Sequence, residues 1–164
     1  MADPGSDHAI PFVPGRELSR ALDAAVEPVL ARRFPELRYG AGRLEAGSDV
    51  LGFDSPRSMD HDWGPQLSLF LPEGLYTSAL EAEIRHVLAE ELPFAVLDVP
   101  THFQDHLVTP TATRPINHGV SVVTLRGVVQ GWLGLDHGLD APVRLEEWLV
   151  MPEQQLRDFT TGLV

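Results

Sequence analysis

The sequence predicts an α/β domain with a mixed sheet of four to five strands and helices packed on one face of that sheet. Three observations support this fold class. Apolar residues recur at the helical period in residues 17–34 and 78–92. β-Branched, apolar runs bounded by prolines occupy residues 94–99 and 119–125 and indicate strands. The composition, 43% hydrophobic and 22% charged, is typical of a soluble globular protein.

The chain is expected to form one domain, because 164 residues match the size of an ordinary single domain. Residues 1–15 hold three prolines and two glycines and show little periodicity. They are predicted to form a flexible N-terminal arm, and residues 16–164 the domain itself. The first helix is expected to kink at Pro28, which lacks a backbone donor.

Further elements follow from local patterns. Residues 40–47 are predicted to form a short strand that enters a glycine turn, and residues 58–71 a strand bent at Gly64 and Pro65. A pattern that resembles a capping box, Ser-x-x-Glu from Ser78, predicts the start of the second helix.

The last third of the chain gives a mixed signal. Residues 127–138 are spaced by glycines and fit no single element. Residues 145–159 have helical spacing, with Pro152 placed to start a helix.

Charge and composition narrow the classes of partner. The formal net charge is -12, and all twelve basic residues are arginine, so no lysine-rich stripe exists to bind long nucleic acid. No cysteine is present, which leaves oxygen and imidazole ligands for any metal ion. No signal peptide or long apolar run is found, so a cytoplasmic location without membrane contact is expected.

One segment carries a pattern with a chemical meaning. Gly47 and Ser48 are followed, after a spacer of eleven residues, by Asp60 and Asp62. On a strand, two residues spaced by one project from the same face. Two adjacent carboxylates repel one another unless a cation lies between them. The pattern therefore predicts that Asp60 and Asp62 bind Mg²⁺ or Mn²⁺.

The Gly-Ser pair supplies the second half of this predicted site. Gly47 lets the backbone approach a phosphate closely, and the Ser48 hydroxyl and nearby backbone N–H groups can donate to it. Magnesium commonly binds through one or two carboxylates together with substrate phosphates. The segment therefore predicts a site for a metal-bound nucleoside triphosphate.

This pattern resembles the signature of the polymerase β-type nucleotidyltransferase superfamily, a Gly-Ser followed by an Asp-x-Asp flanked by apolar residues. More closely, the strings GSDVLGFDSPRSMDHDWGPQL, RRFPELRYGAG and VRLEEWLVMPEQQL resemble the domain of unknown function 4037 family. The resemblance covers roughly residues 12–164. It implies a nucleotidyltransferase-like fold and transfer of a nucleoside monophosphate from a triphosphate to an unknown acceptor. A catalytically idle nucleotide-binding or partner-binding module of the same fold is the alternative.

The resemblance also implies catalytic residues and exposes two departures. Superfamily members have a third carboxylate on a neighbouring strand, for which Asp98 is the favoured candidate. If the equivalent strand is GVSVV instead, Ser121 occupies the position and the third acid is absent. Asp49 stands where many members carry an arginine after the Gly-Ser, and Arg57 is expected to offset that charge at the phosphates.

The resemblance further implies a missing component. Small-molecule members of the superfamily add a helical domain or a second subunit that closes over the nucleotide. We therefore expect an additional helical domain or a homo-oligomer to cover apolar side chains near the C-terminus, namely Trp148, Leu156, Phe159 and Leu163.

Overall fold

The computed structural model describes residues 11–44, 47–60, 63–102, 113–138 and 140–162. These residues form a mixed α/β structure, which confirms the predicted class at that level.

The central element is a three-stranded sheet with the strand order β1-β2-β5. Strand β1 (Gly40–Gly42) runs antiparallel to β2 (Leu67–Leu71), and β5 (Val120–Thr124) runs parallel to β2. The parallel pair β2 and β5 therefore forms the centre and one edge of the sheet.

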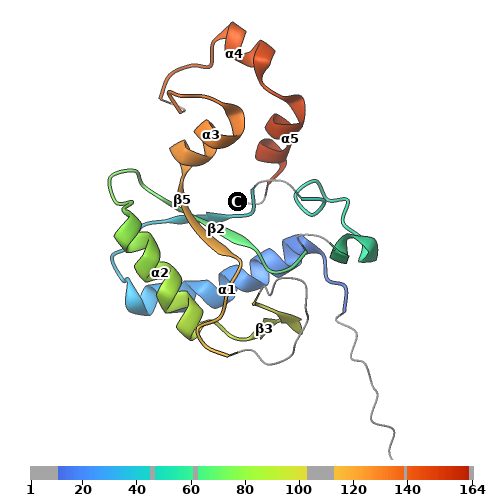
Figure 1. Cartoon of the computed structure of the whole chain (residues 1–164), viewed down its shortest axis with the longest axis vertical. Helices are drawn as coiled ribbons and strands as arrows, with labels where there is room; N and C mark the ends of the chain where they lie inside the picture. The colour runs from blue at the N-terminus through green and yellow to red at the C-terminus, as the bar shows by residue number, and fades with distance from the viewer. Residues whose placement is uncertain (1–10, 45–46, 61–62, 103–112, 139, 163–164) are drawn as a thin grey trace, which may run out of the picture.

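Two helices pack against one face of this sheet (Figure 1). They are α1 (Gly15–Arg33), which continues through Pro28, and α2 (Ser78–Glu91). The helix-period residues predicted from the sequence lie in the shared core, including Leu22 and Leu30 of α1 and Ile84 and Leu88 of α2, all fully buried. In the described residues the prediction of helices on one face holds for α1 and α2 only.

Alternation along β2 and β5 separates the two faces of the sheet. Leu69 of β2 and Val122 of β5, which are register partners, belong to the core. Ser68 and Ser121 are also register partners, and alternation directs both to the opposite face. The sheet thus carries a hydroxyl pair on the face away from the main core.

Three helices form a second group beside the sheet, at the top of Figure 1. They are α3 (Leu125–Leu133), α4 (Leu145–Val150) and α5 (Glu153–Thr161), with Pro152 as the N-cap of α5, as predicted. A small core joins α3 and α5, formed by Val129, Leu133 and Leu135 with partly buried neighbours that include Trp132 and Phe159.

Helix α4 leaves several apolar side chains in solvent. Leu145, Leu149 and Val150 are each more than 70% exposed, and Trp148 is half exposed. Of the apolar side chains expected to need a cover, Phe159 instead packs in the small core and Leu156 is half-buried. Leu163 lies outside the described residues.

The predicted strand over residues 58–71 is wrong in its first half. Residues Pro56–Asp60 form a 3-10 helix, η1, and the strand begins only at Leu67. The turn at Ser55 explains this, because its backbone N–H donates to the Ser58 hydroxyl at 3.1 Å and its carbonyl accepts from the Ser58 N–H at 2.8 Å. Proline at the first helical position favours the same conformation.

The predicted strand over residues 94–99 is also wrong. The segment folds into a hairpin of β3 (Ala95–Val96) and β4 (Val99–Pro100), separate from the main sheet. Leu97 and Asp98 form the two-residue turn with φ of 49° and 63°, the left-handed geometry of tight hairpins. In the described residues the main sheet has three strands, fewer than the four to five predicted.

Candidate functional site

The Gly47-Ser48 turn places glycine where two charged side chains come close. A Cβ atom on Gly47 would lie 2.1 Å from Oδ1 of Asp49 and 2.9 Å from Nη2 of Arg43. The Asp49 side chain therefore folds back over the glycine. Ser48 is exposed, and its carbonyl accepts from the N–H of Phe53 at 2.8 Å, which closes the turn.

Asp49 is held by an ion pair that the sequence did not reveal. The Nε of Arg43 donates to Oδ2 of Asp49 at 3.0 Å, and Nη1 donates to the carbonyl of Leu44 at 2.6 Å. The side chains of Arg43 and Asp49 are only 5% and 14% exposed. Asp49, the apparent departure from the superfamily pattern, is thus directed inward, where its charge is balanced and does not oppose a phosphate.

The same loop is anchored to the first turn of α1. The backbone N–H of Gly15 donates to Oδ2 of Asp54 at 2.6 Å. Arg16 donates to the carbonyls of Asp49 at 3.1 Å and Val50 at 2.5 Å, and also to the carbonyl of Thr161 in α5. Because the N-terminus of a helix carries partial positive charge, the carboxylate of Asp54 is also favoured there. The loop from 47 to 54 is therefore fixed to two helices.

The predicted metal ligands, Asp60 and Asp62, follow this loop in the sequence. Asp60 is the last residue of η1, so the prediction that it lies on a strand is wrong. Asp62 lies outside the described residues. Alternation of side chains along a strand therefore does not apply to Asp60. Among the described residues, no group of three or more His, Asp or Glu side chains is arranged to hold a metal ion.

Arg57, predicted to offset charge at the phosphates, is exposed on η1, and Figure 1 shows this short helix at the margin of the molecule. The compensation expected from Arg57 is supplied at Asp49 by Arg43 instead.

Asp98, the favoured third carboxylate, lies exposed at the tip of the β3-β4 hairpin. The strand beside β2 is β5, the GVSVV segment, where Ser121 faces Ser68 in register. The expectation that Asp98 follows on the neighbouring strand is wrong, because its segment turns back on itself. The alternative position, Ser121, is the one that the sheet brings next to β2.

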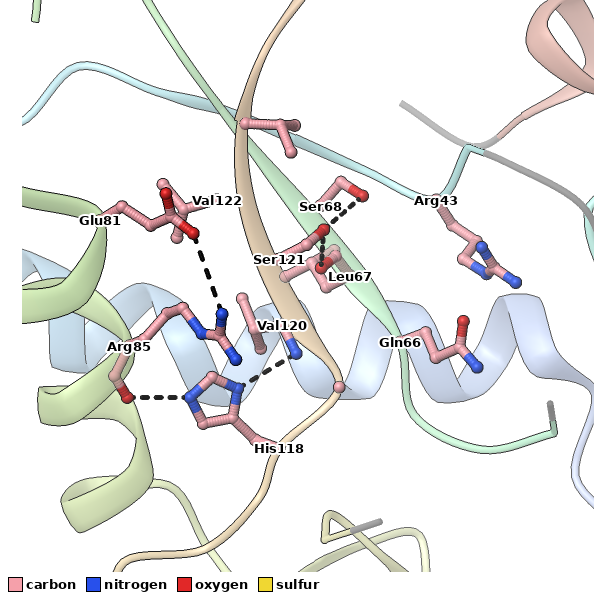
Figure 2. A pocket seen from close by; sticks show the side chains of 12 residues that line it. Arg43, Gln66, Leu67, Ser68, Glu81, Arg85, His118, Val120, Ser121 and Val122 are labelled. Atoms are coloured by element: carbon pink, nitrogen blue, oxygen red, sulfur yellow. Dashed lines mark hydrogen bonds and ion pairs between the residues drawn. The ribbon is translucent and has the colours of Figure 1, made fainter. Parts of the chain in front are cut away.

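A cavity of about 340 Å³ borders this face of the sheet and the edge strand β5 (Figure 2). Ser68 and Ser121 hydrogen-bond to each other in it, with their hydroxyl oxygens 2.9 Å apart. Arg43 and Gln66 line it on one side, and α2 contributes to the other. Because Arg43 also holds Asp49, the cavity and the Gly47-Ser48 turn share a wall.

His118 fixes the lower end of this cavity between β5 and α2. Its Nδ1 accepts from the backbone N–H of Val120 at 3.1 Å, so Nε2 carries the proton and donates to the carbonyl of Arg85 at 2.9 Å. Burial lowers the pKa of His118, and the nearby charge of Arg85 acts in the same direction. The imidazole is therefore neutral and ties the strand to the helix.

Ser121 entered the sequence-based prediction only as the alternative to Asp98, and no cavity was predicted, although a signal existed for Ser68 and Ser121. Ser68 and Ser121 each interrupt an otherwise apolar strand, LSLFL and VSVVT. A polar residue within a buried strand needs a hydrogen-bond partner, and the two serines supply it for one another. For Arg43, no local pattern indicated burial.

Comparisons with known proteins give no match to a family model, a curated protein or a solved structure. No helix in the described part of the chain is long and apolar enough to cross a membrane.

Proposed function

We propose that the chain binds a nucleoside triphosphate with a divalent cation at the segment from Gly47 to Asp62 and transfers the nucleoside monophosphate to an acceptor hydroxyl. The observation that carries the proposal is the turn at Gly47, where a Cβ atom would have to displace the Asp49 carboxylate that Arg43 holds. The turn leaves Ser48 exposed, and its loop is anchored by Arg16 and Arg43.

The donor chemistry fits magnesium or manganese. Asp60 and Asp62 offer carboxylate oxygens, and the absence of cysteine excludes thiolate ligands, which agrees with the preference of these ions for oxygen. These two residues would hold the ion, which would neutralise phosphate charge in a protein with a net charge of -12. The backbone at Gly47 and the hydroxyl of Ser48 would orient the phosphates.

In the proposed reaction, the acceptor oxygen forms a bond to the α-phosphorus. The bond between that phosphorus and the oxygen bridging to the β-phosphate breaks, and pyrophosphate leaves with the electron pair. The hydroxyl proton passes to water. Positioning and electrostatic stabilisation supply the acceleration in this kind of chemistry, and the rigid loop contributes the positioning.

A specific observation favours the second candidate, a catalytically idle nucleotide-binding or partner-binding module. The strand beside β2 carries Ser121, and Asp98 is exposed on a separate hairpin. The proposal of transfer therefore assigns no general base. If a third acid is required, this chain binds a nucleotide without turning it over.

Calorimetry with Mg²⁺ and each of ATP, GTP, CTP and UTP tests binding. The proposal expects at least one nucleotide to bind intact protein, and expects Asp60→Asn with Asp62→Asn to abolish that binding. A charge-matched control, Glu83→Gln with Asp136→Asn, removes two exposed carboxylates elsewhere and should leave binding unchanged. Absence of nucleotide binding, or equal binding by both double variants, would refute the proposal.

Pyrophosphate release separates the two candidates. Transfer predicts release that depends on an added hydroxyl compound, whereas an idle module binds nucleotide and releases none. Restoring an acid with Ser121→Asp should then generate release only if the missing carboxylate was the cause of inactivity.

A further inference from the structure

We infer that the cavity beside β5 is the acceptor subsite, and that it takes a small, uncharged, hydroxyl-rich molecule. This inference rests on the proposed function and names the substrate class that the function leaves open. The volume of about 340 Å³ lies at the lower end of the roughly 300–1,000 Å³ common for small-molecule pockets.

The charge of the lining residues supports an uncharged ligand. Arg43 is paired with Asp49, and Arg85 lies 3.8 Å from Glu81 across one turn of α2. Each guanidinium thus has a carboxylate beside it, and the imidazole of His118 is neutral. A charged ligand would lose part of its hydration when it enters the cavity. These ion pairs would not compensate for that loss, because each arginine already has a carboxylate beside it.

The hydrogen-bonding groups support a hydroxyl-rich ligand. Ser68 is 6% exposed and Ser121 is half-buried. The Ser121 hydroxyl donates to the carbonyl of Leu67 at 3.5 Å, so the bond between the two hydroxyls is donated by Ser68, and lone pairs remain on both oxygens. Gln66 adds an amide at the same wall. The serine pair can accept from a ligand hydroxyl, and an amide can donate to one, which together is what a hydroxyl of a ligand requires.

The remaining surface argues against a nucleobase as the occupant. The described residues that line the cavity include no Phe, Tyr or Trp, so they provide no large aromatic face for a base to stack on. The edge strand β5 instead lines the cavity with Val120 to Val123, of which the Val120 N–H already donates to His118. Edge strands present uncharged backbone donors and acceptors, which suit a polyol.

The position of the cavity gives it a role in the proposed reaction. Figure 2 shows Arg43 at the side of the cavity that Gln66 and Ser68 also line. Arg43 holds Asp49, which folds over Gly47. Arg43 therefore borders both the cavity and the Asp49 side chain that covers the turn proposed to bind phosphate.

The test uses backbone amide NMR shifts of the full chain with three neutral probes: glycerol, glucose and myo-inositol. Glycerol 3-phosphate, glucose 6-phosphate and myo-inositol 1-phosphate are the charged counterparts. The inference expects at least one neutral probe to shift the amides of residues 66–68 and 118–122, and to bind more tightly than its charged counterpart. No shift with any neutral probe, or tighter binding of the charged compounds, would overturn it.

A matched pair of variants tests the hydroxyls. Ser121→Ala should weaken binding of the neutral probe about tenfold, whereas Ser78→Ala, exposed at the start of α2, should not change it. Equal affinities would refute the assignment. The charge comparison on the unmodified chain stands even if Ser121→Ala misfolds.

Parallel calorimetry with Mg²⁺ and the nucleotides separates this inference from the proposed function. Nucleotide binding without polyol binding refutes the subsite alone. Polyol binding without nucleotide binding refutes the proposed function, and with it the role of the cavity as an acceptor site. Binding of both, with Ser121→Ala affecting only the polyol, supports both.

Discussion

Replacing Asp49 with alanine should destabilise the protein through the arginine that it leaves behind. The side chain of Arg43 is only 5% exposed, and its guanidinium donates to both carboxylate oxygens of Asp49, at 3.0 and 3.4 Å. In Asp49→Ala the guanidinium keeps its contact with the carbonyl of Leu44 but loses its carboxylate. The loss of one carboxylate beside a buried guanidinium is the source of the expected cost.

Removing one partner of a buried ion pair costs about 3–5 kcal/mol. We expect about 3 kcal/mol, the lower end, because the carbonyl of Leu44 remains and the Asp49 side chain is 14% exposed. For a domain of this size, roughly 2–4 °C of melting temperature is lost per kcal/mol, which gives a decrease of roughly 6–12 °C.

A double variant checks the cause. Arg43→Met with Asp49→Ala removes more contacts than Asp49→Ala, yet it should be more stable, because no charge remains buried. Urea unfolding followed by circular dichroism measures all three proteins, with Glu83→Ala on the exposed face of α2 as the control. The reasoning fails if Asp49→Ala is as stable as Glu83→Ala, or if the double variant is the least stable.

Three further outcomes are expected. Gly47→Ala should lose about 1–3 kcal/mol because its Cβ has no space, whereas Gly131→Ala, with nothing within 4 Å, should be neutral or stabilising in urea unfolding. The pKa of His118 is lower in the folded chain than in the unfolded chain, so the unfolded chain is protonated first as the pH falls. The free energy of unfolding should therefore decrease as the pH drops below about 6.5. His118→Gln should flatten that slope, and exposed His86→Gln should leave it unchanged. Arg16→Met should speed amide hydrogen exchange in residues 47–53 and in α5 together, and exchange confined to one segment would argue against a shared anchor.

The parts of the fold that the sequence predicted well are those fixed by periodicity. Leu22, Leu30, Ile84 and Leu88 follow the helical period, and all four are fully buried in the core under the sheet. The run of β-branched residues near Val122 likewise formed a strand. These patterns report how one element buries one face, which is a local property.

The wrong strand predictions concern two segments in which a local hydrogen bond or a tight turn determines the backbone conformation. The hydroxyl of Ser58 accepts the N–H of Ser55, which stabilises a 3-10 turn where a strand was predicted. Leu97 and Asp98 adopt left-handed backbone in a hairpin, although neither is glycine and the flanking residues read as one strand. Asp98 was favoured as a catalytic residue on that reading, so the error in local structure became an error in the site.

Only the part of the candidate site that is formed by residues adjacent in the sequence could be predicted. Gly47 and Ser48 are adjacent in the chain, and the turn that they form is set by local residues together with Arg43. The partners of Ser121, by contrast, depend on which strand lies beside β2 and in which register. Loop closure over more than fifty residues brings Ser68 and Ser121 together, and no local period encodes such a pairing.

The orientation of Asp49 bears on the choice between a transferase and a catalytically idle module. An acidic residue beside a phosphate-binding turn would weaken anion binding if it faced the ligand. Its side chain instead lies against Gly15 and Gly47, whose missing Cβ atoms leave room for it, and Arg43 balances its charge. The turn is thus stabilised without presenting that negative charge at its exposed side. Asp49 therefore gives no reason to regard the proposed site as lost, and the alternative of an idle module depends on Ser121 beside β2 and on Asp98 at the separate hairpin.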